Sequence, residues 1–167
     1  MSFDAYAFEV AQRLTAQPLQ LRVVGRVGLA PDALFDRITD IDALASWLPT
    51  AKRTHSDDSN AEAPQEVGAV RIIDSGFGPQ AEERVVYFER PRAYAYRASD
   101  RSLRGLASDH LSVIGVEAHP NGGSVLVWLS FAKPPRSRLV ALAGEKVFGY
   151  VLRGGVRNLE KRYPVRG

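Results

Sequence analysis

The chain has 167 residues, of which 45% are hydrophobic and 25% charged, and this is the composition of one globular domain with its own core. It contains no cysteine, so disulfides, thiolate metal ligands and thiol nucleophiles are excluded. No apolar run reaches the length of about 18 residues that a membrane-spanning helix needs, and Asp4 and Glu9 interrupt any signal-peptide pattern. We therefore expect a cytoplasmic protein without stable membrane insertion.

The net charge of +3 is unevenly distributed along the chain. Residues 133–167 carry nine Lys or Arg and two Glu, a charge of +7, which leaves −4 for the rest. Such a stretch meets an anionic partner, or it forms a solvated helix face near the negative end of the helix dipole. We favour the solvated face, and because no nucleic-acid-binding motif is present we expect no nucleic-acid partner.

The first part of the chain predicts a helix, a strand and two short helical segments. Apolar residues at three- and four-residue spacing indicate an amphipathic helix over residues 3–17, which Pro18 ends. Residues 19–29 alternate between two faces, as a strand does. Pro31 suits the first turn of a short helix, and residues 40–46 predict a second.

The middle of the chain predicts an antiparallel meander. Residues 55–65 are polar and rich in turn formers, which indicates a surface loop. His55, Asp57 and Asp58 in that loop lack a fourth ligand, so we expect no metal site, and the absence of any dinucleotide or phosphate-binding motif predicts no cofactor. Short turns between the following runs require antiparallel pairing. The expected strands are residues 69–74, 81–88, 92–98, 108–118 and 124–132, with residues 100–107 as a connector before the last two.

The closing element is a long amphipathic helix over residues 135–163, whose apolar stripe needs a sheet to pack on. Its glycines Gly144, Gly149, Gly154 and Gly155 each cost about 1 kcal/mol relative to alanine. Such a helix bends, admits a close neighbour or moves. We interpret it as the lid of a cavity, and the element order as an α+β fold.

The chain contains, in this order, the short motifs Ala30-Pro31, Leu34-Phe35, Ile38, Asp40, Trp47, Pro49, Gly68, Glu83-Arg84-Val85, Pro91, Tyr94, Tyr96, Gly122-Gly123-Ser124, Leu126, Trp128 and Leu159-Glu160. In order and spacing they resemble the START-like superfamily, also called SRPBCC, and within it the polyketide cyclase/dehydrase type. The resemblance implies a helix-grip fold, in which a curved antiparallel sheet of about seven strands wraps the long C-terminal helix around a deep apolar cavity. It covers residues 19–163, so we divide the chain into an N-terminal helical extension, residues 1–18, and a START-like domain, residues 19–167. The chain departs from the family at Ser124, where the family usually has Thr.

The resemblance also implies that Trp128 faces the cavity, and a period of two then places alternate residues of the last two strands beside it. The opposite phase stays open, because both faces of residues 124–132 are apolar. The candidate ligand-binding residues are Arg71, Glu83, Tyr94, Tyr96, His110, Ser112, Ile114, Leu126, Trp128, Ser130, Phe148 and Leu152.

On this phase Val125, Val127, Leu129 and Phe131 point outward. An apolar second face of this kind predicts a homodimer, unless the N-terminal helix covers it.

Three functions remain open. We favour a protein that binds a small hydrophobic or aromatic ligand in the cavity. The first alternative is a polyketide cyclase/dehydratase-like enzyme with His110 as acid/base, although a structural role for His110 is the preferred interpretation. The second is an interaction protein that uses the apolar sheet face or the basic C-terminal helix. For Glu83 we favour pairing across the sheet over anchoring of a ligand, and Arg71 either meets a carboxylate or faces solvent.

Overall fold

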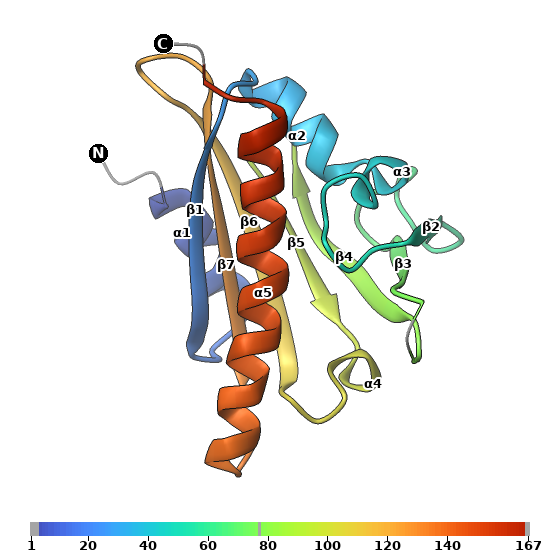
Figure 1. Ribbon diagram of the computed structural model, residues 1–167. Helices are drawn as coiled ribbons and strands as arrows, with labels where there is room; N and C mark the ends of the chain where they lie inside the picture. The colour runs from blue at the N-terminus through green and yellow to red at the C-terminus, as the bar shows by residue number, and fades with distance from the viewer. Residues whose placement is uncertain (1–3, 77, 166–167) are drawn as a thin grey trace.

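The computed structural model describes residues 4–76 and 78–165 (Figure 1). Phe3 in the expected first helix and Phe77 in an expected turn lie outside the described residues. The elements are α1 (Ala5–Leu14), β1 (Leu19–Val27), α2 (Pro31–Thr39), α3 (Ile41–Leu44), β2 (Arg53–Asp57), β3 (Val70–Asp74), β4 (Ala81–Glu89), β5 (Ala93–Ala98), α4 (Asp100–Leu103), β6 (Ser108–Ala118), β7 (Ser124–Lys133) and α5 (Arg138–Arg162).

The strands form a seven-stranded sheet in the order β1-β7-β6-β5-β4-β3-β2, and every neighbouring pair is antiparallel. The long helix α5 crosses one face of the sheet and α1 lies on the other (Figure 1). The α+β class and the helix-grip arrangement expected from the sequence are therefore confirmed.

The edge strand β2 corrects the sequence analysis, which placed the surface loop from residue 55 onward. Residues 53–57 instead pair with β3. Their side chains are polar and alternate between exposed and half-buried, so they carry no apolar strand signal. Pairing with β3 holds them, and the hydroxyl of Thr54 donates to the carbonyl oxygen of Ile41 at 2.7 Å.

Strands β6 and β7 are buried on both faces. On the α5 side, Ile114 and Trp128 belong to one core cluster with Leu152. On the other side, Val127 and Leu129 belong to a second cluster with the apolar face of α1. Trp128 therefore faces α5, as the resemblance implied. The opposite face of β7, whose apolar side chains led us to expect a homodimer, is covered by α1.

Glycines let α5 lie close to its neighbours. A Cβ on Gly25 of β1 would be 2.2 Å from Val156 Cγ1 of α5, and one on Gly154 would be 2.6 Å from Pro49 Cγ. A Cβ on Gly144 would be 2.9 Å from the carbonyl oxygen of Leu106. Of the interpretations offered for the helix glycines, close approach is the one that these distances support.

Among the described helices, none is both long and apolar enough to cross a membrane. Nor do residues 4–76 and 78–165 bring three or more His, Asp or Glu side chains together in a way that suits a metal ion.

Candidate functional site

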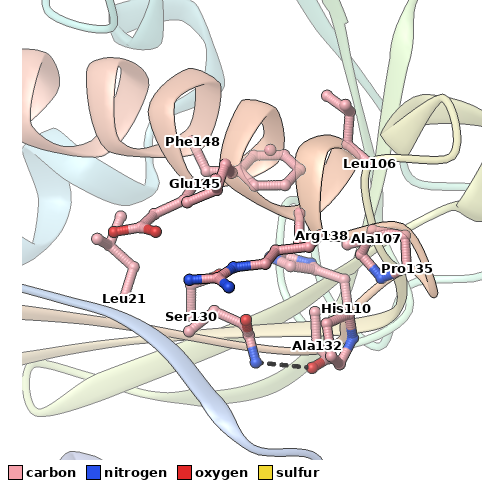
Figure 2. Close-up of a pocket in the computed structure, with 15 residues that line it drawn as sticks. Leu21, Leu106, Ala107, His110, Ser130, Ala132, Pro135, Arg138, Glu145 and Phe148 are labelled. Carbon is pink, nitrogen blue, oxygen red and sulfur yellow. Dashed lines mark hydrogen bonds between the residues drawn. The ribbon is translucent and has the colours of Figure 1, made fainter.

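Two adjoining cavities lie between α5 and the sheet. The inner cavity has a volume of about 160 Å³ and lies under the middle of α5. The outer cavity, about 150 Å³, lies under the N-terminal end of α5 (Figure 2). His110, Ser130 and Phe148 line both, so these three side chains form the wall between them.

A wider groove of about 560 Å³ adjoins the inner cavity at the protein surface. Thr50, Ile73 and Leu103 line both spaces, as do Val147 and Val151 of α5. The groove therefore borders the inner cavity on the side of the protein surface.

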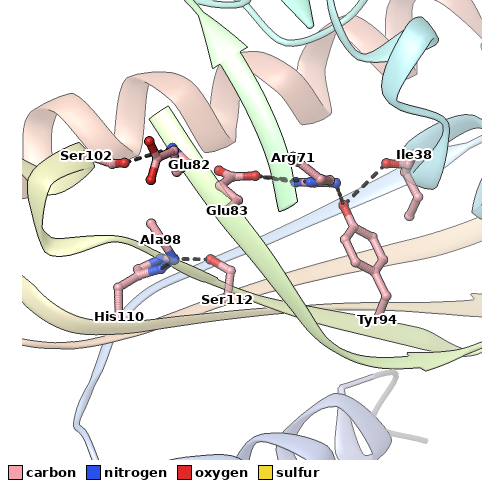
Figure 3. A network of polar contacts seen from close by, with 9 residues as sticks. All are labelled: Ile38, Arg71, Glu82, Glu83, Tyr94, Ala98, Ser102, His110 and Ser112. Atoms are coloured by element: carbon pink, nitrogen blue, oxygen red, sulfur yellow. Dashed lines mark hydrogen bonds and ion pairs between the residues drawn. The ribbon is translucent and has the colours of Figure 1, made fainter. Parts of the chain in front are cut away.

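A buried ion pair forms one wall of the inner cavity (Figure 3). Arg71 on β3 and Glu83 on β4 are directly opposite in the strand register. The Arg71 side chain is 4% exposed and that of Glu83 14%. Arg71 Nε donates to Glu83 Oε2 at 3.2 Å, and a second nitrogen, Nη2, bonds the same oxygen. Of the two alternatives for Arg71, the structure has the carboxylate partner.

Two tyrosines complete the surroundings of the Arg71 guanidinium. Nη1 donates to the hydroxyl of Tyr94 at 3.0 Å, and this hydroxyl in turn donates to the carbonyl oxygen of Ile38 at 3.3 Å. The guanidinium also lies over the ring of Tyr96, 4.6 Å from its centroid. Burial alone would lower the pKa of Arg71, but the charge interactions with Tyr94, Glu83 and Tyr96 outweigh it and raise that pKa. Arg71 therefore remains a cation inside the fold.

His110 is held through both ring nitrogens. Its Nδ1 accepts from the backbone N–H of Ala98 at 3.2 Å, so the neutral ring carries its proton on Nε2. Nε2 lies 3.1 Å from Ser112 Oγ, which also bonds the hydroxyl of Tyr96. Burial, with a smaller contribution from the charge of Arg97, lowers the pKa of His110 to about 4. The ring is therefore neutral at pH 7.

This geometry limits the chemistry of His110. A general base needs a lone pair within reach of the proton it removes. The lone pair of Nδ1 is occupied by Ala98, and Nε2 carries the proton shared with Ser112. The arrangement is typical of a positioned structural histidine in a cavity wall.

The structure brings most of the predicted site residues together. Tyr94, Ile114 and Leu126 are exceptions, because their side chains are buried in the core rather than in the cavity wall. Those that line the inner cavity are Arg71, Glu83, Tyr96, His110, Ser112, Trp128, Ser130, Phe148 and Leu152. The indole N–H of Trp128 is buried and has no hydrogen-bond partner among the described residues.

Further lining residues come from segments that the sequence analysis did not assign to the site. Leu44 and Leu48 reach the inner cavity from α3 and the turn after it, and Leu103 from α4. Val147 and Val151 of α5 could have been predicted from the sequence. They are four residues apart, as Phe148 and Leu152 are, and each directly precedes one of those two residues, so the four side chains lie together on the helix. Nothing in the local sequence signals that the short segments α3 and α4 close the cavity.

Comparison with known proteins identifies relatives over most of the chain. Residues 19–164 match the family described as polyketide cyclase / dehydrase and lipid transport. A comparison with curated proteins gives no match.

Solved structures share the fold at low sequence identity. A Thermobifida fusca protein aligns with a TM-score of 0.71 and 22% identity, covering 86% of this chain and 91% of its own. XoxI from Bacillus cereus aligns with a TM-score of 0.68 and 18% identity, covering 86% and 94%. The protein Ara h 8.0201 aligns with a TM-score of 0.66 and 14% identity, covering 85% and 94%.

Proposed function

Because the chain belongs to the polyketide cyclase / dehydrase and lipid transport family, we propose that it binds a small hydrophobic or aromatic molecule in the inner cavity. The observation that carries the proposal is the combination of apolar walls with a charged pair. Leu48, Trp128 and Leu152 supply apolar surface, and the Arg71–Glu83 pair offers polar atoms at one wall. Ligand sites are typically apolar with a few convergent polar groups of this kind.

The size of the cavity sets the size of the ligand. An apolar cavity of about 150 Å³ accommodates a molecule such as benzene. The inner cavity, about 160 Å³, thus suits one aromatic ring or a short aliphatic body. A longer molecule requires the outer cavity as well, and rotation of Phe148 in the shared wall would join the two.

Polar groups in the wall favour a ligand that carries a hydroxyl or carbonyl oxygen. Buried donors in proteins almost always have a partner, whereas the indole N–H of Trp128 has none among the described residues. An acceptor oxygen on the ligand would satisfy it. The carboxylate of Glu83, bonded to Arg71 through one oxygen, is placed to accept from a ligand hydroxyl.

The alternative function, cyclisation or dehydration of a reactive ligand with His110 as acid/base, has less support. Both ring nitrogens of His110 are engaged, and its pKa of about 4 lies below the working range of a general acid/base near neutral pH. A reaction that disappears in His110→Gln, with the fold and ligand binding unchanged, would establish the enzyme instead.

The test is isothermal titration calorimetry with phenol, a single ring that carries one hydroxyl, as the probe. Val147→Trp places a large side chain where the groove meets the inner cavity, at a half-exposed position that tolerates it, and should abolish the binding heat. Leu139→Trp, on the same helix and lining neither cavity, is the control and should bind as the wild type does. Equal binding by the two variants, or no heat with the wild type and no molecule retained in native mass spectrometry, would refute the proposal.

A further inference from the structure

The N-terminal half of α5 exposes apolar side chains to solvent. Leu139 is 80% exposed and Tyr150 66%, while Leu142 and Val147 are each about half exposed. Large apolar side chains gathered on one helix face mark an interaction surface more often than scattered ones do.

Leu139 and Tyr150 share a single line along the helix with basic residues, and Leu142 and Val147 flank that line on its two sides. Exposed residues recur at alternating steps of four and three, which keeps them on one side of an α-helix. We call this line the outward stripe; its members are Leu139, Ala143, Lys146, Tyr150, Arg153 and Arg157.

The charge around the stripe is strongly positive. Arg136 and Arg138 precede it and are also exposed. Between residues 136 and 157 the sequence contains five Lys or Arg and a single acid, Glu145. An apolar strip with this flanking charge is the pattern of a helix that lies in the interface of an anionic bilayer, with its apolar side chains below the headgroups.

We propose that the outward stripe of α5 docks on a lipid surface that carries negative charge. A second copy of the chain fits less well, because the stripe contains no acidic residue, so Lys146, Arg153 and Arg157 would have no partner of opposite charge in the stripe of the other copy. Nucleic acid would neutralise the cations but leave Leu139 and Tyr150 in water. An anionic lipid surface satisfies both the charge and the apolar side chains.

The docked face borders the openings of the cavities. Leu142 lines the outer cavity, and Val147 and Tyr150 line the groove next to the inner one. The N-terminal end of α5 also projects beyond the sheet (Figure 1). Docking would therefore bring both openings to the lipid surface, where a hydrophobic molecule is exchanged without crossing water; this last step rests on the proposed function, whereas docking itself does not.

The experiment is sedimentation of the full chain with vesicles, in the absence of any cavity ligand. Phosphatidylcholine vesicles are compared with vesicles that also contain phosphatidylserine. Each Lys or Arg near such a surface strengthens binding about fivefold, so Lys146→Glu, Arg153→Glu and Arg157→Glu combined should leave the protein in the supernatant. The matched control reverses three exposed arginines away from α5, Arg13→Glu, Arg53→Glu and Arg84→Glu, and should sediment nearly as the wild type does.

A second variant tests the apolar part of the stripe without changing charge. Leu139→Ser with Tyr150→Ser should weaken sedimentation with phosphatidylserine vesicles by at least about tenfold, since each side chain loses its burial. All the substituted positions are exposed, so the fold is retained.

Three results would overturn the proposal. One is a wild type that stays in the supernatant with both kinds of vesicle, and another is equal loss of binding in the stripe variant and the charge-matched control. The third is a dimer in sedimentation-velocity runs without vesicles that Leu139→Ser with Tyr150→Ser dissociates, which would assign the stripe to a second copy. Since phenol binding is measured without vesicles, docking and ligand binding fail or succeed separately.

Discussion

Replacing Arg71 by methionine should destabilise the protein by about 3 kcal/mol. Removing one partner of a buried ion pair typically costs about 3–5 kcal/mol, because the other charge stays buried without compensation. Here the remaining charge is Glu83, whose side chain is 14% exposed and loses both bonds to the guanidinium. The inner cavity beside Glu83 has room for water, which places the expected loss at the lower end of that range.

Urea denaturation followed by circular dichroism measures this loss. In a thermal unfolding experiment on a chain of this length, a loss of about 3 kcal/mol corresponds to a decrease in Tm of about 6–12 °C. The control is Arg53→Met, which removes an arginine from an ion pair with Asp74 on the neighbouring strands. Because the Arg53 side chain is 83% exposed, its loss should cost less than about 1 kcal/mol.

The double variant Arg71→Met, Glu83→Leu separates stability from binding. Replacing both charges by apolar side chains should restore most of the stability, while the polar wall offered to a ligand is gone. We expect a stable protein with weakened phenol binding. A cost of Arg71→Met no larger than that of Arg53→Met would refute the reasoning, since Glu83 would then be solvated without its partner.

Three further predictions concern other parts of the fold. Burial lowers the pKa of His110 to about 4 in the folded protein, from about 6.5 in the unfolded chain, so the unfolded state takes up the proton first as the pH falls. The contribution of His110 to stability should therefore be complete above about pH 6.5 and should decrease as the pH falls toward 4. Urea midpoints measured across this range should change less in His110→Gln than in the wild type. Gly25→Ala places a Cβ 2.2 Å from Val156 Cγ1 and should cost about 1–3 kcal/mol in the same assay, with partial recovery when Val156→Ala is added; no recovery would locate the strain elsewhere. Val10→Asp introduces a charge into the buried contact between α1 and the sheet, and size-exclusion chromatography should show self-association through the uncovered face, whereas a monomer would mean that α1 is dispensable as a cover.

The sequence predicted the strands that have an apolar face. Asn121-Gly122, a typical hairpin turn pair between two long runs rich in apolar residues, predicted the β6–β7 hairpin, because this signal is local. Strand β2 was not predicted, because its own residues are polar and only its pairing with β3 makes it a strand. The phase of β7 could not be read from its own residues, which are apolar on both faces; α1 resolves it by covering Val127 and Leu129.

The candidate site was predicted in part for a similar reason. Alternation along a strand places Ser112 and His110 on one face, so their neighbourhood follows from spacing alone. The pairing of Arg71 with Glu83 depends on the register between β3 and β4, which no local pattern specifies. The depth of Tyr94 likewise depends on α2, since its ring packs edge-on against Phe35 at a centroid distance of 6.2 Å.

The described hydrogen bonds between α5 and the rest of the fold lie near the C-terminus of the helix, and this gives α5 a gradient of backbone protection. Near its C-terminus, Asn158 Nδ2 donates to the carbonyl oxygen of Trp47 at 2.9 Å, Glu160 accepts from the backbone N–H of Arg26 at 2.9 Å, and the carbonyl oxygen of Tyr163 accepts from Gly28 at 2.7 Å. The first turns, around Leu139, have few buried contacts. Segments with exposed hydrogen bonds and little burial open at low free energy, so deuterium should enter the amides of the first turns long before those near Leu159. On this gradient the C-terminal turns of α5 stay attached to the sheet, while the first turns, which border the outer cavity, open locally without unfolding the sheet.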